Sequence, residues 1–419
     1  MLISLLLFLV FANFAILAWV RSDAAAIITS FLLPSYLLRF QLFGVPFYFV
    51  EVLIYITFFI LGVRFFLKRE KFWCSGFEGP ILFFLIAALA AVFISPDILG
   101  GLGIFKAYFL APILFFYVLV NFVSAKQISK IISGLALSGV FLVLFGFSQY
   151  CGFLGGLREG RITSFFESAN YLGLFLGPIF VLCFCLWIED PRLRFLRCLI
   201  LLILGTAIFL TFSRGTWFGV AIGTLVFGIL FLLPKIKNKK FFAFVGVAFV
   251  SFFAVAFLLL PFYFRLVPES RIAASENIRI EIWKTSFQMI GQKPISGVGL
   301  GHFQEAFKEF TKDRVNYPEY ISPHARTPHN IFLNFWLQTG LGGLLAFLWI
   351  AVLFYKKGFR ILNSKSYILH SAIVAAMTTL IAHGLVDASY WKNDLAILFW
   401  VIIALMVIER REGARKEVL

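Results

Sequence analysis

Apolar stretches of roughly twenty residues recur along the chain, and short polar or basic connections separate them. A helix of that length crosses about 30 Å of hydrocarbon at a rise of about 1.5 Å per residue. Windows such as residues 200–212 are apolar on every face, whereas the strands of a membrane β-barrel alternate in polarity. The pattern therefore predicts an all-α, polytopic integral membrane protein.

The same pattern predicts about twelve membrane spans, or thirteen if every candidate crosses. The candidate at residues 24–38 is short and contains Pro34, so it is either half of a hairpin or part of one bent helix. The expected spans are residues 2–20, 24–38, 47–67, 81–94, 104–122, 131–150, 171–188, 199–212, 217–233, 241–264, 331–354, 367–386 and 395–408.

Composition supports a membrane protein and argues against a nucleic-acid-binding one. The chain is 61% hydrophobic and 14% charged, whereas soluble domains are about 25% charged. Its net charge of +16 comes from short basic clusters between apolar segments, not from one soluble face. The first span lacks a basic start and a small-residue cleavage site, so we expect a retained helix. The five cysteines form no disulfide framework or zinc pattern.

The basic clusters also predict the orientation of the chain. Connections rich in Lys and Arg are expected in the cytoplasm, and the connections at the other ends of the spans are expected outside. The basic clusters are residues 68–71, 126–130, 192–197, 235–240, 356–365 and 410–416. This parity predicts transmembrane helices over residues 1–264, a large periplasmic loop over 265–330, and further helices with a cytoplasmic tail over 331–419. The expected location is the bacterial inner membrane, with the loop facing the periplasm.

The long loop is expected to contain two amphipathic helices. Apolar side chains recur at three- and four-residue spacing in Ile280, Trp283, Phe287 and Ile290, and again in Phe303, Phe307 and Phe310. Lys293 and Pro294 and a run of glycines separate the two groups. These helices either cap the bundle or, as we favour, wall a lipid-facing site.

Three polar features could carry chemistry. Arg214 stands between two apolar runs, where an arginine needs an anionic partner or must snorkel to the interface. Arg279 lies on the polar side of the first amphipathic helix, where a solvated surface residue is the ordinary interpretation. His329 follows Pro328 just before an apolar span, so it is expected near the positive end of that helix, where the ring stays neutral and can accept a proton. The plain alternative is a histidine that only caps the helix.

The order and spacing of these features resemble the O-antigen ligase and polymerase superfamily. The middle block runs from Arg279 to Gly301 as RIEIWKTSFQMIGQKPISGVGLG. The third block is His329 and Asn330, nine residues, and then Gly340-Leu341-Gly342-Gly343, which is similar to the ligase pattern. The resemblance covers about residues 161–400, including Arg161 with Asn170 and the stretch from His383 to Asp387.

The resemblance implies inverting transfer of a glycan from an undecaprenyl diphosphate carrier to an acceptor hydroxyl, without a metal ion or other cofactor. Arg214 and Arg279 would bind the donor diphosphate and His329 would act as the catalytic base. An arginine guanidinium can donate two parallel hydrogen bonds to a departing diphosphate, and a base is needed because the attacking hydroxyl must lose a proton. Secondary candidates are Asn330, Arg161, His383 and Asp387, of which the last two are expected to form a structural hydrogen-bonded pair.

Several functions fit this sequence. The His-Asn spacing favours lipid A core of lipopolysaccharide as the acceptor, while an O-antigen polymerase or a protein O-oligosaccharyltransferase would use the same kind of donor. Outside this class, a glycolipid transporter or flippase would also be polytopic and basic, but it would need no base at His329. The histidines at 302, 324 and 329 with Glu305 and Glu309 match no zinc spacing, so we expect no metal site.

Overall fold

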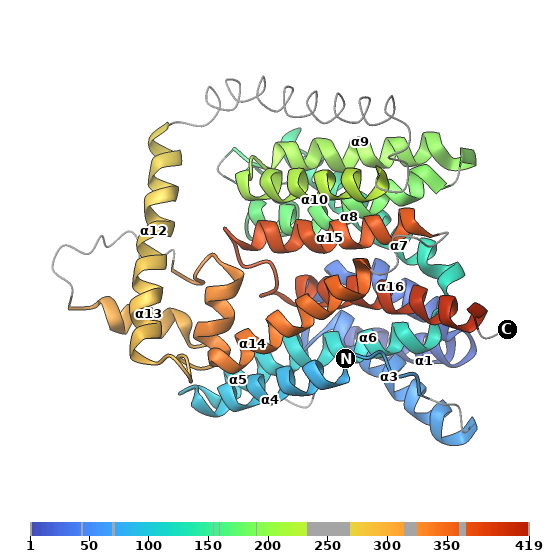
Figure 1. Cartoon of the computed structure of the whole chain (residues 1–419), viewed down its shortest axis with the longest axis horizontal. Coiled ribbons are helices and arrows are strands. Elements are labelled where there is room, and N and C mark those ends of the chain that lie inside the picture. The colour runs from blue at the N-terminus through green and yellow to red at the C-terminus, as the bar shows by residue number, and fades with distance from the viewer. Residues whose placement is uncertain are drawn as a thin grey trace.

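A computed structural model of the chain shows a layered bundle of long helices (Figure 1). The structure describes residues 2–42, 45–68, 72–153, 155–158, 160–189, 191–232, 269–313, 325–359 and 366–417. The expected span at 241–264 and the candidate metal ligand His324 lie outside these ranges. Helices account for most of the described residues, which agrees with an all-α polytopic membrane protein.

The described residues contain eight helical segments that are long and apolar enough to cross a membrane. The total number of spans and the sidedness of the loop remain predictions. The helices before the long loop are α1 Leu2–Val20, α2 Ser22–Phe31, α3 Phe49–Lys68, α4 Glu78–Ile94, α5 Ile98–Ile104, α6 Ala111–Phe122, α7 Ile128–Tyr150, α8 Ala169–Glu189, α9 Arg194–Leu210 and α10 Arg214–Leu232. The later helices are α12 Glu269–Gln292, α13 Phe303–Thr311, α14 Ile331–Phe359, α15 Tyr367–Gly384 and α16 Asn393–Glu417.

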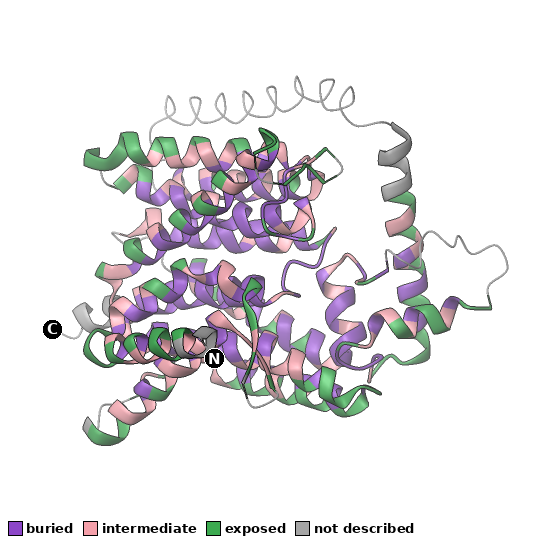
Figure 2. Cartoon of the chain, turned by 180° about the vertical axis from the view of Figure 1, so that it is seen from behind, coloured by how far each residue is buried: buried purple, intermediate pink, exposed green. Residues whose placement is uncertain are grey.

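Helix α15 lies at the centre of the bundle. It packs against α10 and α8 on one side and contacts α16 and α14 on the other. Figure 2 shows that buried residues concentrate in these central layers, whereas exposed positions lie on outer helices such as α9. The apolar part of α16 is fully buried although the segment is not among the eight apolar spans. Burial of α15 and α16 fixes the loop between them, which carries candidate site residues.

The short second candidate span is not one straight helix. Helix α2 ends at Phe31, and a 3₁₀ turn at Leu33–Leu37 contains Pro34 near its start. Strands β1 (Arg39–Leu42) and β2 (Val45–Tyr48) then form a two-stranded antiparallel hairpin, which the sequence pattern did not predict. Proline suits the first turn of a helix but cannot continue one, which explains why α2 stops here.

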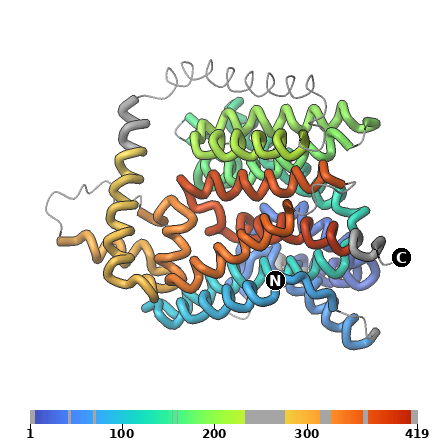
Figure 3. The backbone as a smooth tube through the Cα atoms, viewed as in Figure 1, coloured from blue at the N-terminus to red at the C-terminus, as the bar shows by residue number. Residues whose placement is uncertain are grey.

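The two amphipathic helices of the loop are present as α12 and α13. Helix α12 crosses the ends of the bundle helices instead of running parallel to them (Figure 3). Its buried face was wrongly predicted in part: Ile280 and Phe287 are exposed, whereas Ile282 and Met289 are buried. Together with Phe303 and Phe307 of α13 and Leu333 and Leu337 of α14, these side chains form a separate apolar core. The loop helices therefore pack on the bundle.

The glycine run after α12 docks into a break in α14. Gly340 has φ 68° and ψ −177°, which interrupts the helix. Val298 donates its backbone N–H to the carbonyl oxygen of Leu337 at 2.7 Å, and Leu341 donates to that of Ile295 at 3.0 Å. A Cβ at Gly297 or Gly340 would overlap the backbone of the opposite segment. Gly297 and Gly340, one in each sequence block, are thus explained by close backbone packing.

Candidate functional site

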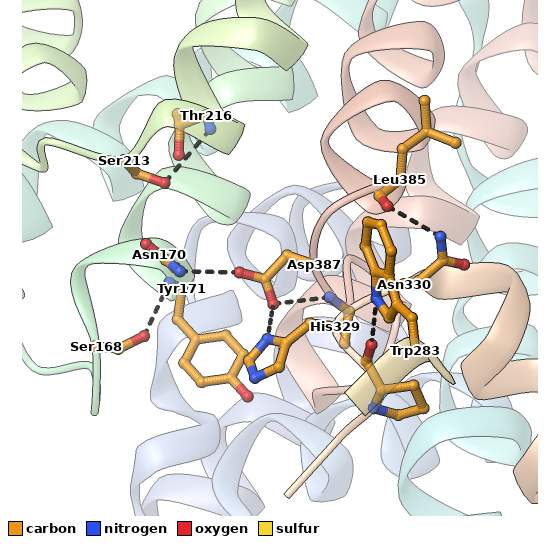
Figure 4. Close-up of polar contacts among 12 residues, drawn as sticks. Ser168, Asn170, Tyr171, Ser213, Thr216, Trp283, His329, Asn330, Leu385 and Asp387 are labelled. Atoms are coloured by element: carbon orange, nitrogen blue, oxygen red, sulfur yellow. Dashed lines mark hydrogen bonds and ion pairs between the residues drawn. The ribbon is translucent and has the colours of Figure 1, made fainter. Parts of the chain in front are cut away.

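His329 and Asp387 form a hydrogen-bonded pair between two loops, one before α14 and one after α15 (Figure 4). Nδ1 of His329 lies 3.2 Å from Oδ1 of Asp387. The His329 side chain is 27% exposed and that of Asp387 is 6% exposed. An ionised carboxylate only accepts hydrogen bonds, so Nδ1 carries the proton and Nε2 is left as the acceptor. This arrangement gives the partly exposed histidine the tautomer that a general base requires.

His329 lies just before α14, close to the N-terminus of that helix. Asn330, not Pro328, begins the helix: its Oδ1 accepts the backbone N–H groups of Phe332 at 3.0 Å and Leu333 at 3.1 Å. This is the geometry of an N-cap, which satisfies two of the otherwise unpaired N–H groups of the first turn. His329 precedes the cap with a positive φ of 48°. The imidazole therefore stands beside the helix N-terminus, not inside its first turn.

Asn330 also ties the two loops together. Its Nδ2 donates to the carbonyl oxygen of Leu385 at 2.9 Å, two residues before Asp387. Both ends of the Asn330 amide are therefore engaged within the protein. This geometry favours a role for Asn330 in holding the histidine loop in place.

A second line of hydrogen bonds reaches Asp387 from the other side. Asn170, near the start of α8, donates from Nδ2 to Oδ2 of Asp387 at 3.0 Å. Arg161 donates from Nη2 to Oδ1 of Asn170 at 2.7 Å and from Nε to the carbonyl oxygen of Thr211 at 2.6 Å. One continuous series of hydrogen bonds thus links Arg161, Asn170, Asp387 and His329. Sequence reasoning had named three of the four as site residues, but not Asn170.

Trp283 connects α12 to the same site. Its Nε1 donates to the carbonyl oxygen of Pro328 at 2.9 Å, directly before His329 (Figure 4). Trp283 stands four residues after Arg279 in the middle sequence block, and this bond gives its indole a structural role. Helix α12 therefore holds the histidine loop as well as carrying an arginine.

Arg214 is the first residue of α10, and Arg279 lies on α12. Nη1 of Arg214 forms an ion pair with Oε1 of Glu276, so this arginine has the anionic partner that the sequence did not reveal. Arg279 stands one helical turn after Glu276 and its positive charge acts on Asp387. The structure therefore brings both arginines toward the His329 side of the molecule.

The predicted pairing of His383 with Asp387 is wrong, because Asp387 pairs with His329 instead. His383 is buried, and its Nε2 atom has no hydrogen-bond partner among the described residues. The imidazole packs where α15 crosses α10: a Cβ at Gly215 would lie 2.9 Å from its ring, and one at Gly219 would lie 2.9 Å from its Cβ. Glycines of α10 thus make room for this histidine.

Opposing effects set the charge state of Asp387. Burial raises the pKa of the carboxyl group, but the hydrogen bond from His329 and the electrostatic effects of His329, His383 and Arg279 outweigh it. The pKa is therefore held well below its ordinary value. Backbone N–H of Ala388, which donates to Oδ1 at 2.9 Å, also favours the ionised form. Asp387 thus remains a carboxylate that can orient the imidazole.

The wall of the site contains a lysine that sequence reasoning missed. Nζ of Lys392 lies 3.7 Å from the ring centroid of Tyr171, the residue after Asn170, and 3.8 Å from Oε2 of Glu167. Burial lowers the pKa of Lys392. Lys392 is the basic residue in a connection between α15 and α16 that is otherwise free of Lys and Arg, and this isolation could have marked it in the sequence. Among the described residues, no three His, Cys, Asp or Glu side chains gather as metal ligands.

The comparisons with known proteins agree with the motif resemblance. Residues 199–348, about a third of the chain, match the family model described as O-antigen ligase. A Rickettsia felis protein named "Putative polysaccharide ligase" is 25% identical over 203 residues, which cover 47% of this chain and 46% of that protein.

The matched segment contains Arg214, Arg279 and His329, whereas Arg161, Asn170 and Asp387 lie outside it. The hydrogen-bonded chain therefore joins the matched segment to flanking parts of the sequence. The predicted resemblance is confirmed over this segment, because residues 199–348 match the O-antigen ligase family model.

Proposed function

We propose that this chain is a membrane glycosyltransferase of the O-antigen ligase type. It transfers a glycan from an undecaprenyl diphosphate carrier to an acceptor hydroxyl at the periplasmic face of the bacterial inner membrane. The observation that carries this proposal is the His329–Asp387 pair, a base with its orienting carboxylate, held beside two arginine-bearing helices. The O-antigen ligase match over residues 199–348 supports the same reaction class.

In this proposal Nε2 of His329 takes the proton of the acceptor hydroxyl. The acceptor oxygen forms a bond to the anomeric carbon as the bond from that carbon to the diphosphate oxygen breaks. The lipid diphosphate leaves with the electron pair, and the imidazolium that forms is stabilised by Asp387. Attack opposite the leaving group inverts the anomeric centre. No step requires a metal ion or another cofactor.

The two arginines stabilise the negative charge that develops on the departing diphosphate. Arg279 carries the positive charge that already acts on Asp387. Arg214 is engaged by Glu276, but both side chains of that pair are substantially exposed, at 36% and 56%. An exposed ion pair is worth only about 0.2–1 kcal/mol, so a diphosphate that accepts two parallel hydrogen bonds from the guanidinium can displace the carboxylate.

We propose lipid A core as the acceptor, because the His-Asn spacing resembles the ligases. A polymerase would use a second lipid-linked glycan, and a protein O-oligosaccharyltransferase would use a hydroxyl of a protein. Each would rely on the same base and the same donor. The acceptor therefore has to be determined by offering all three to the reconstituted chain with one lipid-linked donor.

The decisive experiment is glycan transfer by purified His329→Ala in chelator-treated buffer. General-base assistance is worth about 10²- to 10⁴-fold in rate, so transfer should fall by that factor while donor binding is retained. His302→Ala is the matched control, because His302 begins α13 away from the pair and should leave the rate unchanged. Near-normal transfer by His329→Ala would eliminate His329 as the catalytic base. Activity lost with chelator and restored by a divalent ion would point to a metal site.

The sidedness needs its own test. The exposed native cysteines Cys74, Cys151 and Cys198 are first replaced by serine. Lys308→Cys on α13 should then react with an impermeant thiol reagent in spheroplasts, and Lys126→Cys should react only after lysis. The opposite labelling pattern would reverse the orientation.

A further inference from the structure

A groove separate from the His329 site lies among the first turns of three helices. It has a volume of about 400 Å³ and is formed by α2, α7 and α9. Its lining combines two basic residues, two serines, a glycine and four apolar residues: Lys130, Arg197, Ser129, Ser133, Gly134, Ile27, Ile28, Phe31 and Leu137. Such a mixture is neither a buried core nor an ordinary lipid-facing surface.

The polar and apolar linings are ordered along the helix axes. Helices α2 and α7 begin at the same face, because Gln127 just before α7 donates to Asp23 in the first turn of α2 at 2.6 Å. Arg197 in the first turn of α9 lines the groove together with Lys130. Lys130 lies in the first turn of α7, and Leu137 follows seven residues later, about 10 Å deeper at 1.5 Å per residue. The groove therefore passes from cationic at the membrane face to apolar inside.

Charge decides which amphipathic molecule fits. Asp23 is already bound by Arg21 and Gln127. Arg197 donates to the carbonyl oxygen of Leu186 and lies within electrostatic range of Glu189, so part of its charge is balanced. Lys130 is exposed and faces the groove without such an acid beside it in the lining. The polar end thus keeps a net positive charge.

We propose that this groove binds one anionic glycerophospholipid. Its phosphate contacts Lys130 and Arg197, the serine hydroxyls donate to the headgroup, and one acyl chain lies against Ile28, Phe31 and Leu137. Basic pockets between transmembrane helices are known to bind acidic headgroups, and each Lys or Arg near the headgroup adds roughly a fivefold gain in affinity. Because α9 has little other buried surface, the lipid would tie it to α2 across α7.

The test compares phosphatidylglycerol with phosphatidylcholine binding to the full delipidated chain by native mass spectrometry. Wild type should prefer phosphatidylglycerol, and Lys130→Gln should weaken that binding about fivefold. Arg194→Gln is the matched control, because Arg194 is exposed in the first turn of α9 but does not line the groove. Equal losses in both variants would show diffuse surface attraction and overturn the site.

A second pair of variants tests the groove without changing charge. Ser133→Phe fills the space beside Lys130 and should reduce binding of phosphatidylglycerol, whereas Leu144→Phe on an exposed part of the same helix should not. Unchanged binding by a folded Ser133→Phe would overturn the proposal. If Ser133→Phe does not fold, the comparison of Lys130→Gln with Arg194→Gln decides.

Discussion

Nδ1 of His329 and Oδ1 of Asp387 lie 3.2 Å apart although 57 residues of the chain, including the whole of α14 and α15, separate them. The pair depends on Asn330, which caps α14 and holds the carbonyl of Leu385 in the opposite loop. Orientation of the base is therefore a property of the packed bundle and not of one motif.

Asp387→Asn should nearly abolish transfer. An asparagine amide would donate to Nδ1 and move the imidazole proton to Nε2, which removes the base while preserving shape. We expect a loss of about 10²- to 10⁴-fold in kcat with little change in donor affinity. The measurement is steady-state transfer beside donor binding. Asp387→Asn with wild-type kcat would show that His329 needs no orienting carboxylate.

Asn170→Ala should produce a smaller loss, because it removes one of the two side-chain hydrogen bonds to Asp387. A hydrogen bond to a charged group is worth about 1.5–3 kcal/mol, which limits the expected fall in kcat to about 10- to 150-fold. Asn170→Ala combined with Arg161→Ala should cost little more than Asn170→Ala alone, since Arg161 acts through Asn170. Fully additive losses in the double variant would contradict the idea that Arg161 acts on Asp387 through Asn170.

Much of the fold could be predicted from the sequence because each membrane helix corresponds to one continuous apolar stretch of residues. Long apolar runs located most of the described helices within a few residues, and three- and four-residue spacing located α12 and α13. The hairpin after α2 was missed because its strands are only four residues each, too short for alternation to be distinguished from a loop.

The site was predicted less completely, and for a physical reason. The residues Arg161, His329, Asn330 and Asp387 stood out as polar groups beside apolar spans, but their pairing depends on which loops meet. Spacing along one helix suggested His383 with Asp387, whereas packing placed Asp387 against His329. Glu276 similarly became the partner of Arg214 only through the approach of α12 to α10.

Glu276→Gln should tighten donor binding if Arg214 contacts the diphosphate. The carboxylate competes for the guanidinium, and an exposed pair contributes about 0.2–1 kcal/mol, so the Kd for a lipid diphosphate should fall by at most about fivefold. Glu281→Gln on the same helix, whose carboxylate pairs with Lys284, is the control and should leave the Kd unchanged. Weaker binding by Glu276→Gln alone would mean that the acid positions Arg214 instead of competing with the donor.

Acid stability should reflect the low pKa of Asp387. A carboxyl group whose pKa is lowered on folding stabilises the protein above its unfolded value of about 3.9, and this contribution is lost as the pH falls through the folded value. The difference in Tm between wild type and Asp387→Asn should therefore stay constant from about pH 5 to 8 and shrink only in stronger acid. A difference that already shrinks between pH 7 and 5 would mean that the carboxylate is not held ionised.

Gly340→Ala should destabilise the chain although Gly340 touches no proposed substrate group. Its φ of 68° with ψ of −177° belongs to a region that only glycine adopts readily, and an added Cβ would overlap the carbonyl oxygen of Ile295. Backbone strain of this kind costs about 1–3 kcal/mol, and the clash adds to it, so Tm in detergent should fall by several degrees or more.

Gly342→Ala provides the matched control for that measurement. Gly342 lies two residues further along α14, and a Cβ there would meet Ala87 only at an ordinary 3.6 Å. Alanine favours a helix over glycine by up to about 1 kcal/mol, so this variant should be neutral or stabilising. Equal melting of the two variants would show that the break in α14 tolerates a side chain. Close backbone contact between the Gly297 loop and α14 would then not be what requires a glycine at position 340.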